Sequence, residues 1–222
     1  MSDVDPRFDQ LPRTIPIFPL TGVLLLPRGR LPLNIFEPRY LAMLRDAMGG
    51  ERAIGMVQPT RPGSDMAAKP EVYRVGCVGK VVEFNETQDG RFAIALTGLC
   101  RFEIVEELTV ATPYRQVVAA YARFRADMQP GLGPPGERSR MLRIVRRYFE
   151  ARGIGLDWKA VERAPSDALV DALAMMCPFS PGEKQLLLEA DRGERRTRAL
   201  LSLMEMASLA YVGGAAPDKA LQ

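Results

Sequence analysis

The sequence predicts an α+β protein with a strand-rich first part and a helical second part. From Thr14 to Arg125, short apolar segments mostly alternate with polar residues, which is typical of strands. A stretch rich in proline and glycine follows at 128–136, where neither helix nor strand can continue. Beyond it, apolar residues recur every three or four positions, as in amphipathic helices. We therefore expect a β-subdomain over 13–126, a linker over 127–136 and a helical bundle over 137–212.

The chain is expected to open with strands and a single helix. Apolar residues alternate at Thr14–Phe18, and Leu33–Phe36 forms a second extended segment. Glu37 is the boundary residue before a helix, because Pro38 fits the first helical position, where its missing N–H costs nothing. The helix should run to Met48, after which two glycines end it.

The remaining strands are expected to include a hairpin. An Asp-Gly pair at Asp89-Gly90 is a strong hairpin signal between two apolar arms. Gly98 interrupts the second arm and predicts a bulge or sharp bend. The expected strands are 53–57, 73–84, 91–96 with a continuation beyond Gly98, and 114–124.

Four helices are expected in the second part. Ser166 should cap one of them, and Pro178 should end it. The predicted ranges are 137–152, 166–177, 181–190 and 194–211.

The composition excludes several kinds of chemistry. The chain has no histidine, which removes Ser–His and Cys–His nucleophiles and histidine-based metal sites. No phosphate-binding Gly-rich loop is present, since Gly79-Lys80 is followed by valine. Ser180 and Lys184 are better explained by capping and solvent exposure than by a catalytic dyad. We therefore expect a protein that is not an enzyme and has no cofactor and no metal.

The cysteine count and the lack of targeting or membrane-spanning patterns favour a cytoplasmic protein. Cys77, Cys100 and Cys177 form neither an even set nor a close pair, so we interpret them as small buried hydrophobic residues. No apolar run approaches the roughly 20 residues of a membrane span, and the N-terminus lacks a secretory pattern. We expect a cytoplasmic location and no membrane partner.

Several segments together resemble the substrate-binding domain at the N-terminus of ATP-dependent Lon proteases. The resemblance begins in Phe18–Pro27 and Leu31–Tyr40 and continues in Val75–Glu83, which has a cysteine at position 77 where the family favours threonine. It extends through Asp89–Phe102, with its Gly-x-x-Arg-Phe ending, and includes Ser180–Leu201. The resemblance covers about Thr14 to Tyr211.

This resemblance implies a fold and a function. The fold would be an antiparallel pseudo-barrel of the pseudouridine-synthase-associated (PUA-like) type with one helix, followed by the helical bundle. The function would be that of a non-catalytic protein- or peptide-binding module, a free-standing member without ATPase and peptidase domains. Its partners would be unfolded or extended polypeptide segments, with a protease as a further partner. RNA binding by a PUA-like fold is the alternative, and the oligomeric state stays open.

Two interpretations remain for the predicted site, which consists of Phe36, Glu37, Arg39, Tyr40 and Arg101. In the structural interpretation, Phe36 and Tyr40 pack the helix on the sheet, and Glu37 pairs with Arg39 or with Arg101. In the functional interpretation, the strand-to-helix corner borders a groove that accepts an extended peptide by strand addition. Both interpretations can hold together.

Arginine-rich surfaces are the remaining candidates for binding. Tyr121, Arg123 and Arg125 would share one face of the last predicted strand, a pattern that suits single-stranded nucleic acid. The first helix of the bundle would carry a basic face of Arg138, Arg143, Arg146 and Arg147, and Arg192–Arg198 holds a second arginine cluster. Arginines lying over a helix or strand surface are the simpler explanation. A net charge of +3 is too small to favour tight phosphate-driven binding.

Overall fold

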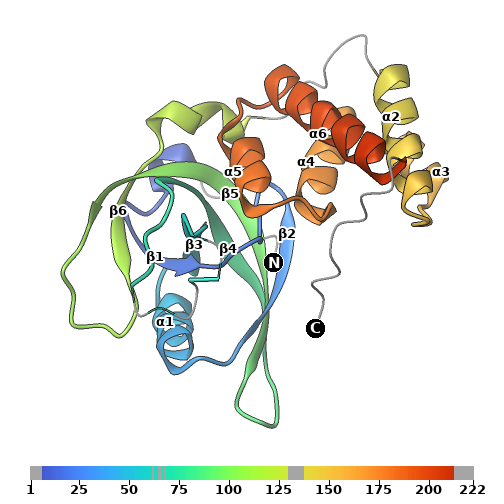
Figure 1. Ribbon diagram of the computed structural model, residues 1–222. Coiled ribbons are helices and arrows are strands. Elements are labelled where there is room, and N and C mark those ends of the chain that lie inside the picture. The colour runs from blue at the N-terminus through green and yellow to red at the C-terminus, as the bar shows by residue number, and fades with distance from the viewer. Residues whose placement is uncertain (1–6, 62, 65–66, 68, 130–137, 213–222) are drawn as a thin grey trace. The chain divides into compact units, whose positions relative to one another are not determined.

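The computed structural model describes residues 7–61, 63–64, 67, 69–129 and 138–212, with side chains described as far as residue 209. The chain divides into two compact units. We call them the sheet unit, residues up to 130 together with 175–189, and the helical unit, residues 131–174 and from 190 onward. Figure 1 shows the strands and α1 within the first unit and a group of helices within the second.

In the described part of the sheet unit, six strands form one sheet. Their order is β2-β5-β4-β3-β1-β6, and β5 also pairs with β6. The strands are β1 (Thr14–Pro19), β2 (Arg30–Ile35), β3 (Ala53–Val57), β4 (Val75–Glu86), β5 (Phe92–Glu107) and β6 (Gln116–Ala120). Helix α1 (Pro38–Gly49) and the short 3-10 helices η1 (Phe8–Gln10) and η2 (Ala122–Met128) complete this part of the unit. The α+β class expected from the sequence is confirmed.

The sheet is mixed, which corrects the prediction of a purely antiparallel barrel. β1 pairs with β3 in parallel, while the other strand pairs are antiparallel. Parallel neighbours need a long crossover connection, and the chain supplies one through β2 and α1. The early half of β5 pairs with β2 and the late half with β6, so the sheet closes on itself while β2 stays at an edge. The arrangement is therefore a curled sheet with one strand outside its closed part.

The ring of Phe102 fills the interior of the closed part, and two glycines make room for it. Phe102 is fully buried. A Cβ atom at Gly55 would lie 2.9 Å from this ring, and one at Gly76 would lie 2.7 Å from it and 2.6 Å from the carbonyl oxygen of Met56. Such distances are not tolerated in close-packed interiors. The glycine of β4 and the Arg-Phe ending in β5 are thus parts of one packing arrangement.

Gly98 lies beside an irregularity in the pairing of β4 with β5, as its position in the sequence predicted. The register shifts between Val78 and Gly79, so that Cys100 and Gly98 oppose consecutive residues of β4. The shift leaves Leu99 as the extra residue of a bulge. A Cβ atom at Gly98 would lie 2.1 Å from the carbonyl oxygen of Leu26. The bulge therefore brings two backbone segments into direct contact.

Helix α5 (Pro181–Glu189) belongs to the sheet unit, although the predicted bundle of 137–212 included it. Buried polar contacts hold it there. The Gln58 side-chain amide donates to the carbonyl oxygen of Pro181 at 3.2 Å, and the Gln185 amide donates to the carbonyl oxygen of Val75 at 3.2 Å. Helical periodicity identifies such a helix but does not tell which unit it packs against.

The described residues of the helical unit form four helices: α2 (Arg138–Ala151), α3 (Trp158–Arg163), α4 (Ser166–Met176, whose last two residues belong to the sheet unit) and α6 (Glu194–Val212). Met141, Val145 and Phe149 bury one face of α2, in agreement with the predicted periodicity. Helix α3 was not predicted, although Asp157 caps it by accepting a hydrogen bond from the Ala160 amide at 3.2 Å. Ser166 is the first residue of α4 rather than a cap before it.

The last predicted strand, 114–124, is shorter than expected. β6 ends at Ala120, and the chain continues as η2. Aromatic residues such as Tyr121 and Phe124 are common in strands, but here both side chains are buried around the 3-10 helix. The predicted linker of 127–136 begins within η2, and its residues 130–136 lie outside the part of the chain that the structure describes.

Candidate functional site

The edge of the sheet carries the predicted strand-to-helix corner. We call this region the β2 arm: β2, residues 80–86 of β4 and residues 92–97 of β5. The register aligns its side chains in rows across the three strands, one of them Leu33, Ile94 and Phe84. β2 has β5 on one side, and within the described residues no strand pairs with its other side. The arm therefore ends in an open strand edge, which is a template for pairing with another chain.

One face of the β2 arm is hollowed. Side chains alternate between the two faces of a strand, and at the centre of this face the strand β5 presents the small residues Ala93 and Ala95. Pro32 and Asn34 of β2 flank them on one side, and Glu83 and Asn85 of β4 flank them on the other. Together with the residues between them they line a trough of about 740 Å³. An ion pair between Arg30 and Glu83 spans β5 at this face.

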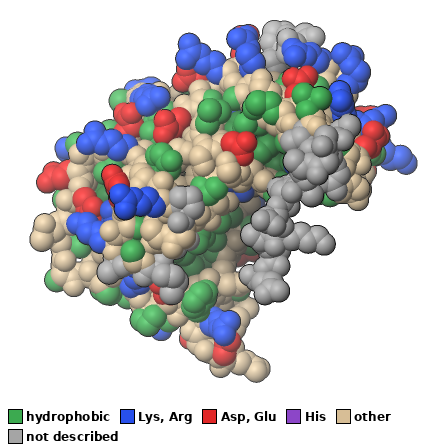
Figure 2. All heavy atoms as spheres, viewed as in Figure 1, with side chains coloured by type: hydrophobic (Ala, Val, Ile, Leu, Met, Phe, Trp, Pro, Cys, Tyr) green, Lys and Arg blue, Asp and Glu red, His purple; other side chains and the backbone are tan. Residues whose placement is uncertain are grey.

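Two aromatic side chains of the β2 arm are exposed to solvent. Phe36, directly after β2, is 60% exposed, and Phe84 of β4 is 42% exposed. The ring of Phe84 stacks on that of Phe92 at 4.8 Å, and the Arg91 guanidinium lies 6.0 Å from the centre of the Phe36 ring. In Figure 2, hydrophobic side chains reach the surface beside charged ones in this part of the sheet unit. Large exposed aromatic rings next to an open edge are typical of interaction surfaces.

The rest of the corner is held by internal contacts. The Arg39 guanidinium donates from Nε to Glu37 at 3.0 Å and lies 4.5 Å from the centre of the Tyr40 ring. Tyr40 is buried, with its ring centroid 4.2 Å from that of Phe18 on β1. Tyr40 therefore packs α1 on the sheet as the structural interpretation expected, whereas Phe36 points outward and does not.

Arg101 is not part of the corner. It lies nine residues after Phe92 on β5, up to about 30 Å along the strand. Its guanidinium is buried and binds both carboxylate oxygens of Asp127 at 2.8 and 2.9 Å. It also donates to the carbonyl oxygen of Leu188 in α5 at 2.9 Å. The expected partner Glu37 pairs with Arg39 instead, so Arg101 connects β5, η2 and α5 within the sheet unit.

The arginine and aromatic pattern after β6 does not form an exposed strand face. Tyr121 is buried, and its hydroxyl donates to the carbonyl oxygen of Pro12 at 2.8 Å. Arg123 pairs with Glu103 at 2.7 Å, and the Arg125 guanidinium lies 4.6 Å from the centre of the Phe8 ring. This segment therefore offers no aromatic ring of its own on which a base could stack.

Ser180 and Lys184 have separate partners. The Ser180 hydroxyl donates to Glu183 at 2.7 Å and caps α5. Lys184 is buried, contrary to the expected exposure, and its ammonium donates to the carbonyl oxygen of Gly22 at 2.7 Å. Burial lowers the pKa of Lys184. The pair acts in the docking of α5 and does not have the geometry of a dyad.

The described residues contain no cluster of three or more cysteine or acidic side chains arranged to hold a metal ion. Over the same residues, none of the helices combines the length and the apolar character that crossing a bilayer requires.

Phe84 and the trough residues are the parts of this surface that the sequence did not identify as a site. A signal was present in the alanines of β5, which alternate with Ile94 and Leu96. The significance of those alanines depends on which residues flank them, and that follows from the register of three strands rather than from one strand alone.

The curled mixed sheet, its edge strand and the accompanying helices define a known class of fold. The N-terminal domain of Lon protease from the Mycobacterium avium complex superposes with a TM-score of 0.63 at 15% identity, covering 86% of this chain and 98% of that one. A Lon N-terminal domain protein from Xanthomonas campestris superposes with a TM-score of 0.63 at 20% identity, covering 85% of this chain and 97% of that one.

The sequence places the chain within a family. The profile of the ATP-dependent protease La (LON) substrate-binding domain matches residues 14–206, and the chain belongs to this family. Lon protease 2 of Sorangium cellulosum is 28% identical over 213 residues, which are 86% of this chain and 24% of that protein. Lon protease of Anaeromyxobacter dehalogenans is 30% identical over 106 residues, which are 48% of this chain and 12% of that protein. The chain thus spans at most about a quarter of the length of these relatives.

Proposed function

We propose that this protein is a non-catalytic module that recognises extended, apolar segments of unfolded polypeptides through the β2 arm. Family membership supports a role in substrate recognition. The observation that carries the proposal is the open edge of β2, which runs directly into the exposed ring of Phe36.

An extended polypeptide can use both the open edge of β2 and the apolar side chains beside it. Its main chain can pair with the free edge of β2, as in strand addition, and its alternate side chains can contact the apolar row that begins at Leu33. Phe36 and Phe84 then supply aromatic area that is already exposed and needs little reorganisation. The ion pair of Glu37 with Arg39 holds the strand-to-helix turn that presents Phe36.

The experiment measures binding of a permanently unfolded, reduced and alkylated protein by fluorescence anisotropy. Replacing Phe36 and Phe84 together with serine should weaken binding by roughly tenfold or more, because burying one large apolar side chain contributes about 1.5–3 kcal/mol. The matched control replaces Val105 and Val110 with serine, since their exposures of 61% and 38% are close to those of the two phenylalanines. The control should bind as the unchanged protein does.

A second probe tests the strand edge itself. The probes are a short apolar peptide and the same peptide with alternate backbone amides methylated. Both present the same side chains, but the methylated amides of the second peptide cannot donate hydrogen bonds to the edge of β2. Tighter binding of the unmethylated peptide is expected. Equal binding of both peptides would contradict strand addition, and absence of saturable binding to the unfolded protein would contradict the proposed function.

RNA binding is the alternative function, and fluorescence anisotropy with labelled single-stranded RNA tests it. Tyr121 and Arg123 suggested this function, but the Tyr121 hydroxyl binds the carbonyl oxygen of Pro12 and Arg123 pairs with Glu103. Retention of single-stranded RNA at low ionic strength with an affinity above that for unfolded protein would favour RNA as the ligand.

A further inference from the structure

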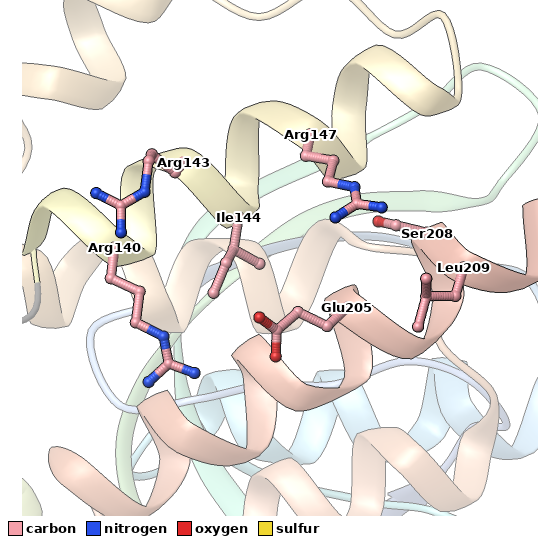
Figure 3. Close-up of a pocket in the computed structure, with 7 residues that line it drawn as sticks. All are labelled: Arg140, Arg143, Ile144, Arg147, Glu205, Ser208 and Leu209. Atoms are coloured by element: carbon pink, nitrogen blue, oxygen red, sulfur yellow. The ribbon is translucent and has the colours of Figure 1, made fainter. Parts of the chain in front are cut away.

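A basic groove lies between α2 and α6 of the helical unit, and the proposed function of the β2 arm does not account for it. Its volume is about 440 Å³. Figure 3 shows the residues that line it, among them Arg140, Arg143, Ile144, Arg147, Glu205 and Leu209.

The groove combines a row of arginines with an apolar floor. Arg140, Arg143 and Arg147 share one face of α2 because residues three and four positions apart are neighbours on a helix. Ile144 lies between them and points toward α6, where Leu209 completes the apolar part (Figure 3). Leu209 is 63% exposed, so this floor is open to a partner.

The charge of the groove is only partly balanced. Elsewhere in the helical unit, two largely buried arginines have acidic partners: Arg192 pairs with Asp167 at 3.1 Å and Arg196 with Asp171 at 2.7 Å. Arg143 and Arg147 are exposed, and no ion pair links either of them to any residue that the structure describes. Two guanidinium groups one helical turn apart repel each other, and an anionic partner would relieve that repulsion.

We propose that this groove binds an acidic amphipathic helix of a partner protein. Carboxylates one turn apart on such a helix match the spacing of Arg143 and Arg147, and the Arg fork binds carboxylates with two hydrogen bonds. Leucine-like side chains on the same face would cover Ile144 and Leu209, which is the helix-in-groove mode of recognition. A nucleic acid fits less well, because the described residues that line the groove include no aromatic ring to stack a base and do include the Glu205 carboxylate.

The test uses the full chain and a labelled helical peptide in which pairs of glutamates alternate with pairs of leucines. Reversing both charges, Arg143→Glu with Arg147→Glu, should weaken binding by about tenfold or more, since two ion pairs are lost and repulsion replaces them. The matched control reverses Arg195 and Arg198 at the start of α6, whose side chains are 79% and 73% exposed. This control has the same change in net charge and should lose less than about threefold.

Three outcomes would overturn the proposal. The first is an equal loss in the groove variant and in the control, which would indicate attraction by net charge alone. The second is equal binding of a peptide with its leucines replaced by serine, which would leave the apolar floor unused. The third is tighter binding of single-stranded RNA than of the acidic peptide. Binding of unfolded protein at the β2 arm is measured separately, so failure here leaves that result unaffected.

Discussion

Glycine residues have different structural roles in the two units. Inside the sheet, Gly55, Gly76 and Gly98 have no room for a side chain, because each Cβ atom would lie within 3.0 Å of another group. In the helical unit, Gly153 and Gly193 have positive φ angles of 65° and 87°, and nothing lies within 4 Å of an added Cβ. The sheet unit therefore depends on close approach of backbone segments, whereas the described glycines of the helical unit lie in turns and loops with open space around them.

This difference follows from how each unit fills its interior. In the sheet unit, a large ring, Phe102, occupies space that neighbouring strands leave by omitting side chains. In the helical unit, the backbones are kept apart by interdigitating side chains such as Val145 and Leu200, both fully buried. We expect the sheet unit to respond more steeply to added volume, since a backbone carbonyl cannot move aside as a side chain can.

The largest effect should come from Gly98→Ala. Its new methyl group would meet the Leu26 carbonyl oxygen at 2.1 Å, so β5 or the segment before β2 must shift. We expect a loss of at least about 4 kcal/mol of unfolding free energy, in the range reserved for severe core defects. Chemical denaturation followed by circular dichroism measures it.

Gly153→Ala is the matched substitution in the helical unit. It adds the same methyl group to open space, and only the positive φ opposes it, at about 1–2 kcal/mol. A Gly98→Ala protein no less stable than Gly153→Ala would contradict the comparison between the units.

A second, smaller effect should follow from Arg101→Met. The substitution leaves the carboxylate of Asp127 buried without its guanidinium, and such a loss costs about 3 kcal/mol. It also removes the hydrogen bond to Leu188, so α5 should lose protection from hydrogen exchange before the strands do. Exchange followed by mass spectrometry measures this order.

The variant Arg101→Met with Asp127→Leu provides the control for this prediction. It removes both charges and should recover part of the lost stability, because no unpaired buried charge remains. Recovery of stability without return of protection in α5 would show that Arg101 acts on the helix through Leu188. Unchanged protection in Arg101→Met would contradict that role.

Much of the fold could be predicted from the sequence because its signals are local. The Pro38 helix start, the Asp89-Gly90 hairpin and the bulge at Gly98 each depend on the conformational limits of one or two residues. The parallel pairing of β1 with β3 and the docking of α5 depend on contacts between distant segments, such as Gln185 with Val75. Periodicity carries no information about those contacts.

The candidate site shows the same division. Phe36 could be found because it precedes a helix start, whereas Phe84 and the alanine-floored trough required the register of three strands. Arg101 was misplaced because the sequence does not tell which acidic residue pairs with it, and Glu37 was considered as its partner. The partner that buries it, Asp127, lies in a 3-10 helix that the sequence predicted as strand and linker.

The smallest effect concerns an ion pair at the margin of the sheet unit. Glu107 binds Arg115 through both oxygens, each at 2.9 Å, and the hydrogen bonds from Arg115 lower the pKa of Glu107 below its ordinary 4.5 although burial opposes them. A carboxylate whose pKa is lower in the folded state stabilises the protein fully above pH 4.5 and loses that contribution as the pH falls through the folded pKa. Glu107→Gln should therefore cost about 0.5–1 kcal/mol at pH 7 and progressively less below pH 4.5.

Unfolding in urea at pH 7, 4.5 and 3 measures this effect. Glu162→Gln is the control in the helical unit, because its ion pair with Arg146 is more exposed, at 55% and 52% of the two side chains. It should change the unfolding free energy by less than about 0.5 kcal/mol at pH 7. A Glu107→Gln protein whose deficit stays constant from pH 7 to pH 3 would show that the loss comes from packing around Arg115, not from the charge of Glu107. The cost at this margin would then be set by packing, as it is at Gly98 in the interior of the sheet.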